Sequence, residues 1–189
     1  MRAQPRRQLL IDTALQLFSK HGYHATGIDL ILSQSGVSKA TLYKHFHCKE
    51  ALILATLVQR NTEIISAAQQ TLATAGATVT HPALLIFDVL NDWFNSEGFF
   101  GCNFINACSE YTDEHNEIHQ YAAQHKENMR QLLMTHLTTG NQALKVRQSE
   151  ALTLLIDGAI VNAHVSGNKQ AALTAKRAAE HLLNCTLPF

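Results

Sequence analysis

The chain has 189 residues, of which 46% are hydrophobic and 16% are charged, so it can form one compact domain or a small domain fused to a medium one. Its apolar runs are far shorter than the roughly 20 residues that cross a bilayer, which excludes a membrane span. No apolar signal region follows the basic N-terminus, so we expect a cytoplasmic protein. The four cysteines form no CxxC pair, which argues against a zinc ribbon and against a disulfide-stapled secreted fold.

The charge is distributed unevenly along the chain. The formal net charge is zero, but residues 1–50 carry seven Lys and Arg against three acidic residues. The remaining 139 residues carry eight basic residues against twelve acidic ones. This asymmetry suggests a polyanion-binding segment joined to a body with another task.

The chain is predicted to be all-α, with about nine helices, because proline and glycine are scarce and no stretch alternates apolar with polar residues. Apolar residues recur at helical spacing in the first helix, and Gly22 follows a basic last turn and ends it. These apolar residues are Leu10, Ile11, Ala14, Leu15 and Phe18.

Short capping signals predict the next three helices. Thr26 is expected to cap the second helix, with Asp29 completing a capping box, and Gly36 is expected to end it after about two turns. Ser38 is expected to cap a short third helix. A long fourth helix is predicted for about residues 49–73.

Five further helices are predicted at about residues 82–95, 101–110, 115–138, 148–165 and 169–183. The last two can pair as an antiparallel hairpin. The helix of residues 148–165 is apolar on more than one face, so it is expected to be buried on two sides. An interface across a twofold axis explains this pattern most naturally, which predicts a homodimer formed by these two helices.

The second and third helices with their tight turn have the layout of a helix-turn-helix. Gly36 permits the left-handed backbone of the turn, and Val37 and Leu42 fix the third helix against the first two. The remaining face of the third helix is then free to enter a major groove. Its polar side chains suit phosphates and base edges of duplex DNA.

Three segments resemble the N-terminal DNA-binding domain of TetR/AcrR-type bacterial transcriptional regulators. They are residues 26–31 (TGIDLI), 35–46 (SGVSKATLYKHF) and 48–52 (CKEAL), within a resemblance that covers about residues 8–54. The resemblance implies a DNA-binding domain in residues 1–48 and a ligand-binding and dimerisation domain in residues 49–189, joined by the fourth helix. It also implies a homodimer, most often a repressor, that leaves a palindromic DNA operator when a small-molecule effector binds.

At positions where this sequence matches the family pattern, the resemblance implies a set of DNA-contacting residues. It implies that Leu42 and Phe46 lie in the core. The set is Thr26, Ser38, Lys39, Ala40, Thr41, Tyr43, Lys44, His45 and Lys49.

Two residues depart from the family pattern. Leu32 replaces a small alanine, and Cys48 replaces the usual Ser or Asn cap of the fourth helix. A thiol caps poorly, so this helix start is expected to be looser. The Cys48 substitution is either incidental or redox-responsive, because a helix N-terminus and Lys49 would both favour the thiolate.

The body beyond residue 80 resembles one subgroup of these regulators in residues 101–110 (GCNFINACSE) and 155–160 (LIDGAI). If the usual architecture holds, its helices enclose an effector pocket, although a plain hydrophobic core explains the same residues equally well. The predicted lining is Trp93, Phe94, Phe104, Ile105 and Tyr121.

Two readings other than a regulator stay open. His115 and His119 stand four residues apart, as two metal ligands on one helix would, but their order is not HExxH. An enzyme using this pair or Cys102 is therefore the alternative, although no reaction is indicated. No catalytic residue, cofactor or metal is expected on the preferred reading. An architectural DNA-binding protein without an effector is the third reading.

Overall fold

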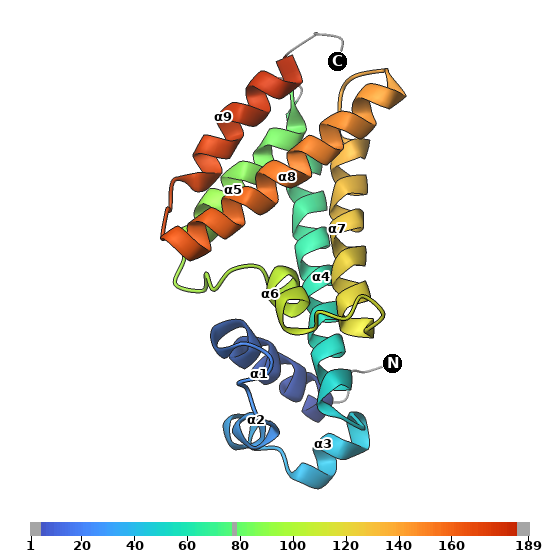
Figure 1. Cartoon of the computed structure of the whole chain (residues 1–189), viewed down its shortest axis with the longest axis vertical. Helices are drawn as coiled ribbons and strands as arrows, with labels where there is room; N and C mark the ends of the chain where they lie inside the picture. Colours follow the sequence, from blue (N-terminus) through green and yellow to red (C-terminus); the bar gives the residue numbers. More distant parts are fainter. Residues whose placement is uncertain (1–4, 77–78, 185–189) are drawn as a thin grey trace. The chain divides into compact units, whose positions relative to one another are not determined.

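The computed structural model describes residues 5–76 and 79–184, and all regular elements within these two stretches are helical. They comprise nine α-helices and one 3-10 turn, η1 (Pro82–Leu84), as Figure 1 shows. The helices are α1 (Pro5–His21), α2 (Ile28–Ser35), α3 (Lys39–His45), α4 (Lys49–Ala73), α5 (Leu85–Phe94), α6 (Asn103–Glu110), α7 (Glu117–Thr135), α8 (Gln142–Ser166) and α9 (Ala171–Asn184). Among the described helices, none combines the length and the apolar character that a membrane crossing requires.

The all-α prediction is confirmed, and the helix ends differ from the predicted ones mainly in α8. This helix begins at Gln142 rather than near residue 148, because the side chain of Asn141 accepts a hydrogen bond from the backbone N–H of Leu144 at 3.1 Å. It ends at Gly167, whose φ of 67° is the left-handed conformation typical of a helix stop.

The chain divides into two compact units. The N-terminal unit comprises Met1–Glu63 and Cys102–His125, and the C-terminal unit comprises Ile64–Gly101 and Lys126–Phe189. Helices α4 and α7 each contribute to both units. The N-terminal unit includes residues 49–63 and 102–125, which lie within the predicted ligand-binding and dimerisation domain of residues 49–189. The boundary between two functional domains at residue 48 therefore stays a prediction.

Helix α1 packs against α2 and α3 in the N-terminal unit. Leu10 and Phe18 of α1, Ile31 of α2 and Leu42 of α3 are almost completely buried in this core, together with Phe46. Burial of each such side chain stabilises the fold by about 1.5–3 kcal/mol. Leu42 and Phe46 therefore lie in the core, as predicted, and α3 is fixed by its apolar side.

Helices α8 and α9 form an antiparallel pair in the C-terminal unit, and both contact α5 (Figure 1). The ammonium group of Lys176 in α9 donates to both carboxylate oxygens of Asp88 in α5, each at 2.7 Å. The hairpin prediction for the last two helices is confirmed. Helix α8 buries Leu152 and Ile156 but exposes Leu154 and Val165.

Candidate nucleic-acid interface

The start of α2 differs from its predicted form. Gly27, not Thr26, is the N-cap residue, and no side chain donates or accepts a capping hydrogen bond there. Thr26 is completely buried, and its hydroxyl donates to the carbonyl oxygen of Gly22 at 2.7 Å. The capping box of Thr26 and Asp29 was therefore a wrong prediction, because α2 begins one residue later and the buried Thr26 hydroxyl instead donates to the carbonyl that follows α1.

The turn between α2 and α3 has the predicted form. Gly36 has a φ of 66°, and its N–H donates to the carbonyl oxygen of Leu32 at 2.9 Å. The hydroxyl of Ser38 accepts a hydrogen bond from the N–H of Thr41 at 3.3 Å, which confirms Ser38 as the cap of α3. Val37 is buried, so the turn is fixed by packing as well as by hydrogen bonds.

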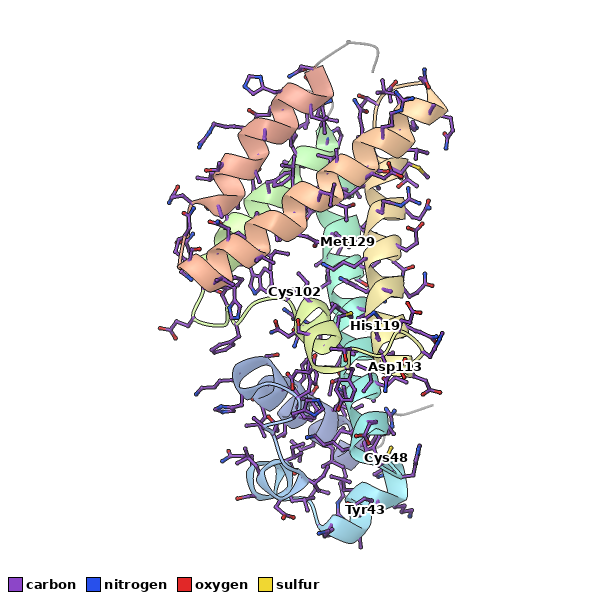
Figure 2. The ribbon with its side chains drawn as sticks, viewed as in Figure 1. Tyr43, Cys48, Cys102, Asp113, His119 and Met129 are labelled. Atoms are coloured by element: carbon purple, nitrogen blue, oxygen red, sulfur yellow. The ribbon has the colours of Figure 1, made fainter. Side chains whose placement is uncertain are left out.

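Helix α3 presents a polar face to solvent. Lys39, Ala40, Tyr43 and Lys44 are exposed, and Figure 2 shows the labelled Tyr43 side chain extending from α3. Lys39 lies 3.7 Å from a carboxylate oxygen of Asp29, and both side chains are largely exposed. An exposed ion pair of this kind contributes about 0–1 kcal/mol, so its ammonium can exchange this partner for a phosphate at little cost.

The start of α4 is capped by sulfur. The Cys48 Sγ atom accepts a hydrogen bond from the N–H of Ala51 at 3.4 Å, in the place where a Ser or Asn oxygen would act. Figure 2 shows Cys48 at the junction of α3 and α4. The thiol thus makes the capping contact that we expected to be weak, and its redox response stays a prediction.

Lys49 and Arg7 are basic residues with structural partners in the N-terminal unit. The Lys49 ammonium donates to the carbonyl oxygen of His24 at 3.3 Å. The Arg7 guanidinium lies 5.1 Å from the centre of the Phe46 ring, directly after α3. Arg7 is one of the seven basic residues among residues 1–50, and a cation–π contact between residues so far apart in the chain leaves no sequence signal.

The predicted pocket residues fall into both compact units. Phe104, Ile105 and Tyr121 belong to the N-terminal unit, where the buried Phe104 ring stacks on the ring of His125 with 3.6 Å between ring centres. His125 is itself buried, and its Nδ1 atom lies 2.7 Å from Oδ1 of Asn61. This buried polar pair was not predicted, because His125 and Asn61 lie in different helices, 64 residues apart in the chain.

The other two predicted pocket residues belong to the C-terminal unit. Trp93 and Phe94 pack against Phe99, with 4.8 Å and 4.9 Å between ring centres. Phe94 is completely buried, whereas Trp93 is half-buried. These contacts are those of a hydrophobic core as much as of a binding site, and the pocket stays a prediction.

The histidine pair of the alternative reading does not gather further ligands. His115 is exposed, and the Nδ1 atom of His119 lies 2.8 Å from the carbonyl oxygen of Tyr111. Figure 2 shows His119 and Asp113 near the start of α7. Among the described residues, no three His, Cys, Asp or Glu side chains group as a metal site would. The enzyme reading thus gains no support from this region.

The sequence matches known proteins most strongly at its N-terminal end. The family "Bacterial regulatory proteins, tetR family" matches residues 10–56. The HTH-type transcriptional activator FasR of Mycolicibacterium smegmatis is 44% identical over 73 residues, which are 39% of this chain and 33% of that protein. The chain thus spans about a third of the length of this relative. The HTH-type transcriptional regulator YjdC of Escherichia coli K12 is 25% identical over 94% of this chain and 93% of its own length.

Solved structures match the fold along nearly the whole chain. SCO4454, a TetR-family transcriptional regulator from Streptomyces coelicolor, aligns with a TM-score of 0.84 and 28% identity over 94% of both chains. The reduced form of NemR from Escherichia coli aligns with a TM-score of 0.84 and 20% identity, over 94% of this chain and 96% of its own. The second likeness concerns the fold alone.

Proposed function

The chain belongs to the TetR family of bacterial transcriptional regulators, and on this premise we propose that it is a sequence-specific DNA-binding regulator. The observation that carries the proposal is the α2-turn-α3 element. The apolar side of this element is buried, and its polar side faces solvent. Ser38 caps the start of α3. A short helix held in this way is suited to enter the major groove, where base edges can be distinguished.

The contacting side chains divide by the chemistry that they offer to DNA. Lys39 and Lys44 carry the positive charge that neutralises phosphates and releases counterions. Hydroxyls at Ser38, Thr41 and Tyr43 can bond phosphate or base edges. Thr26 remains in the set only through its backbone, because its side chain is buried. The proposed set is otherwise unchanged: Ser38, Lys39, Ala40, Thr41, Tyr43, Lys44, His45 and Lys49.

The proposed assembly is a homodimer formed through α8 and α9. Leu154, Gly158, Val161 and Val165 follow one another at helical spacing along α8, and all four are exposed in the single chain. Leu154 and Val165 are 74% and 77% exposed, which is unusual for large apolar residues on one stripe. A twofold axis at this stripe would bury it, and the resulting dimer would carry two α3 helices, one for each half-site of an operator.

The proposed regulation is release from the operator when a small-molecule effector binds. Within the N-terminal unit, the Phe104 ring and the His125 and Asn61 pair offer apolar surface and a few polar groups of the kind that ligand sites use. A coupling free energy of about 1–3 kcal/mol would be enough to change operator occupancy severalfold. Such a regulator works in the cytoplasm, where its operator lies.

Selection of duplexes from a random DNA pool tests the proposed function. The expected result is a palindromic consensus with two half-sites about one helical turn apart, bound by two protomers. An absence of enrichment would contradict DNA specificity. Binding that is sensitive to salt but indifferent to sequence would instead favour the architectural reading. Addition of candidate effectors to the selected complex then shows whether the protein is released.

A further inference from the structure

The side chain of Glu110, the last residue of α6, reaches the turn between α1 and α2. Its Oε1 atom accepts a hydrogen bond from the N–H of Tyr23 at 2.8 Å, and its Oε2 atom accepts one from the N–H of His24 at 2.5 Å. One carboxylate thus holds two consecutive backbone N–H groups that lie more than eighty residues away along the chain. We name these three residues the Glu110 clamp. Charge-assisted hydrogen bonds of this kind are stronger than neutral ones.

Further contacts fix the same turn. The Nε2 atom of His24 lies 2.9 Å from the carbonyl oxygen of Glu110, and its ring packs on Tyr111 with 4.9 Å between ring centres. The carbonyl oxygen of His24 accepts a hydrogen bond from Lys49 at 3.3 Å. The turn is therefore held from α6, from the residue after α6 and from the start of α4.

The opposite end of α6 is bonded to α1 and the turn as well. The buried hydroxyl of Tyr23 donates to the carbonyl oxygen of Asn103 at 3.0 Å. The side-chain amide of Asn103 donates to the hydroxyl of Ser19 at 2.8 Å. Because both ends of α6 contact α1 or its following turn, α6 belongs to the same compact unit as the helix-turn-helix. Figure 1 shows α6 beside α1.

Gly22 leaves the space that the carboxylate occupies. Its φ of +86° favours glycine, and a Cβ atom added at this position would stand 3.0 Å from Oε1 of Glu110. The carbonyl oxygen of Gly22 in turn accepts the hydroxyl of Thr26, one residue before the N-cap of α2. The clamp is thus connected, residue by residue, to the position at which α2 begins.

We propose that Glu110 is a positioning residue for DNA binding, which fixes the α1–α2 turn from α6 and thereby sets the orientation of α2 and α3. This inference rests on the proposed function. The carboxylate of Glu110 is engaged by the two backbone N–H groups, so we assign it no DNA contact of its own. A neutral amide cannot replace it, since its NH₂ group would face one of the two N–H donors.

The test compares Glu110→Gln with wild type in the full-length protein. Glu110→Gln keeps the side-chain volume, and Glu114→Gln is the matched control, because Glu114 is exposed in the loop that follows α6. Amide hydrogen exchange at Tyr23 and His24, resolved by NMR, reports the clamp directly. Affinity for the selected duplex reports its consequence, and the salt dependence of that affinity separates positioning from phosphate contact.

In Glu110→Gln we expect the amide hydrogens of Tyr23 and His24 to exchange at least about tenfold faster than in wild type. We also expect this variant to bind the selected duplex about threefold to tenfold more weakly than wild type, as loss of one charge-assisted hydrogen bond implies. The salt slope and the exchange of the Ile31 and Leu42 amides should not change. Glu110→Asp, which keeps the charge with a shorter reach, should lose less affinity. Glu114→Gln should match wild type in every measurement.

Several results would overturn the inference. Unchanged exchange at Tyr23 and His24 would exclude the clamp in solution, and faster exchange throughout α2 and α3 would reduce Glu110 to a general stabilising residue. Wild-type affinity in Glu110→Gln, with the two amides released, would exclude positioning. Failure of the wild type to bind any duplex would instead overturn the proposed function, together with the inference that rests on it.

Discussion

Lys39 and Tyr43 stand on the exposed face of α3, and they differ in the DNA contact that each can make. Lys39→Ala should weaken binding to all duplexes alike and lower the salt slope by about one, because one phosphate-neutralising charge is lost. Tyr43→Ala should cost about 1–3 kcal/mol, with less change in the salt slope, if the phenol reads a base edge. Kd values measured across a salt series check both.

Lys145→Ala supplies the control for Lys39→Ala, since Lys145 lies in α8 of the C-terminal unit and does not belong to the proposed DNA-contacting set. It should leave affinity and salt slope unchanged. Equal affinity of Lys39→Ala, Tyr43→Ala and wild type for the selected duplex would remove α3 from the interface.

Tyr111 provides a pH-dependent signal close to the Glu110 clamp. Burial raises the pKa of the Tyr111 phenol to about 12, and the nearby carboxylates of Glu50 and Glu110 act in the same direction. Because the unfolded phenol ionises near pH 10, folding favours the protonated form. This contribution to the free energy of unfolding is therefore present below pH 10 and is lost as the pH rises towards about 12.

Ultraviolet titration of phenolate formation checks this value in wild type and Tyr111→Phe. The substitution should remove a component that titrates at about pH 12. Loss of a component at the ordinary tyrosine pKa of about 10 would show that Tyr111 is solvated in solution.

Local capping rules predicted the residues whose partners are close in sequence, and they failed where a distant or competing partner intervened. Ser38 bonds the N–H of Thr41, and Gly36 bonds the carbonyl of Leu32, so short patterns were enough for both. The pattern predicted that the Thr26 hydroxyl caps α2, but in the structure this hydroxyl donates a hydrogen bond to the carbonyl oxygen of Gly22. The sequence could not show that this hydroxyl donates to a carbonyl before α2 instead of accepting a backbone N–H within α2.

At the scale of helices and turns, two glycines with positive φ angles differ in their surroundings. Gly36 has a φ of +66° and no atom within 4 Å of the position that an added Cβ would take, whereas Gly101 has a φ of +82° and a Cβ there would lie 2.9 Å from the His164 ring. Gly36→Ala should therefore cost about 1–2 kcal/mol from backbone strain alone. Gly101→Ala should cost more, because the ring must also move.

Urea unfolding of the two variants measures this difference. Repeating Gly101→Ala in a His164→Ala background removes the ring contact but leaves the backbone strain, so the cost should fall to that of Gly36→Ala. Equal costs of Gly36→Ala and Gly101→Ala in the wild-type background would contradict the close contact with His164.

Helix positions were largely predictable, but helix neighbours were not. The repeated apolar residues and glycine stops placed α1 to α4 within a few residues of their observed bounds. The packing of α6 in the N-terminal unit depends on contacts such as Glu110 with Tyr23, which no periodicity encodes. Phe104 and Trp93 belong to different compact units, so their assignment to one pocket stays a prediction.

At the scale of the whole molecule, the exposed stripe of α8 predicts the oligomeric state. Leu154→Glu should place a charge at the proposed twofold interface and convert the dimer to a monomer, because an unpaired buried charge is strongly destabilising. Val89→Glu is the control, since Val89 is also an exposed apolar residue but lies on α5. Light scattering at micromolar concentration measures the mass.

We expect wild type and Val89→Glu to be dimers. We expect Leu154→Glu to be a monomer with much weaker affinity for a palindromic duplex. A monomeric wild type would contradict the twofold assembly. A Leu154→Glu protein that remains dimeric would move the interface away from this stripe.

The proposed position of α3 in the major groove of the operator is tested most directly by methylation interference on the selected duplex. Methyl groups on guanine N7 project into the major groove, where they block contacts to that edge of the base. If α3 lies in the groove, methylation of guanines in both half-sites should prevent binding, with the two affected clusters about one helical turn apart. Undiminished binding to duplexes methylated throughout both half-sites would contradict this position of α3.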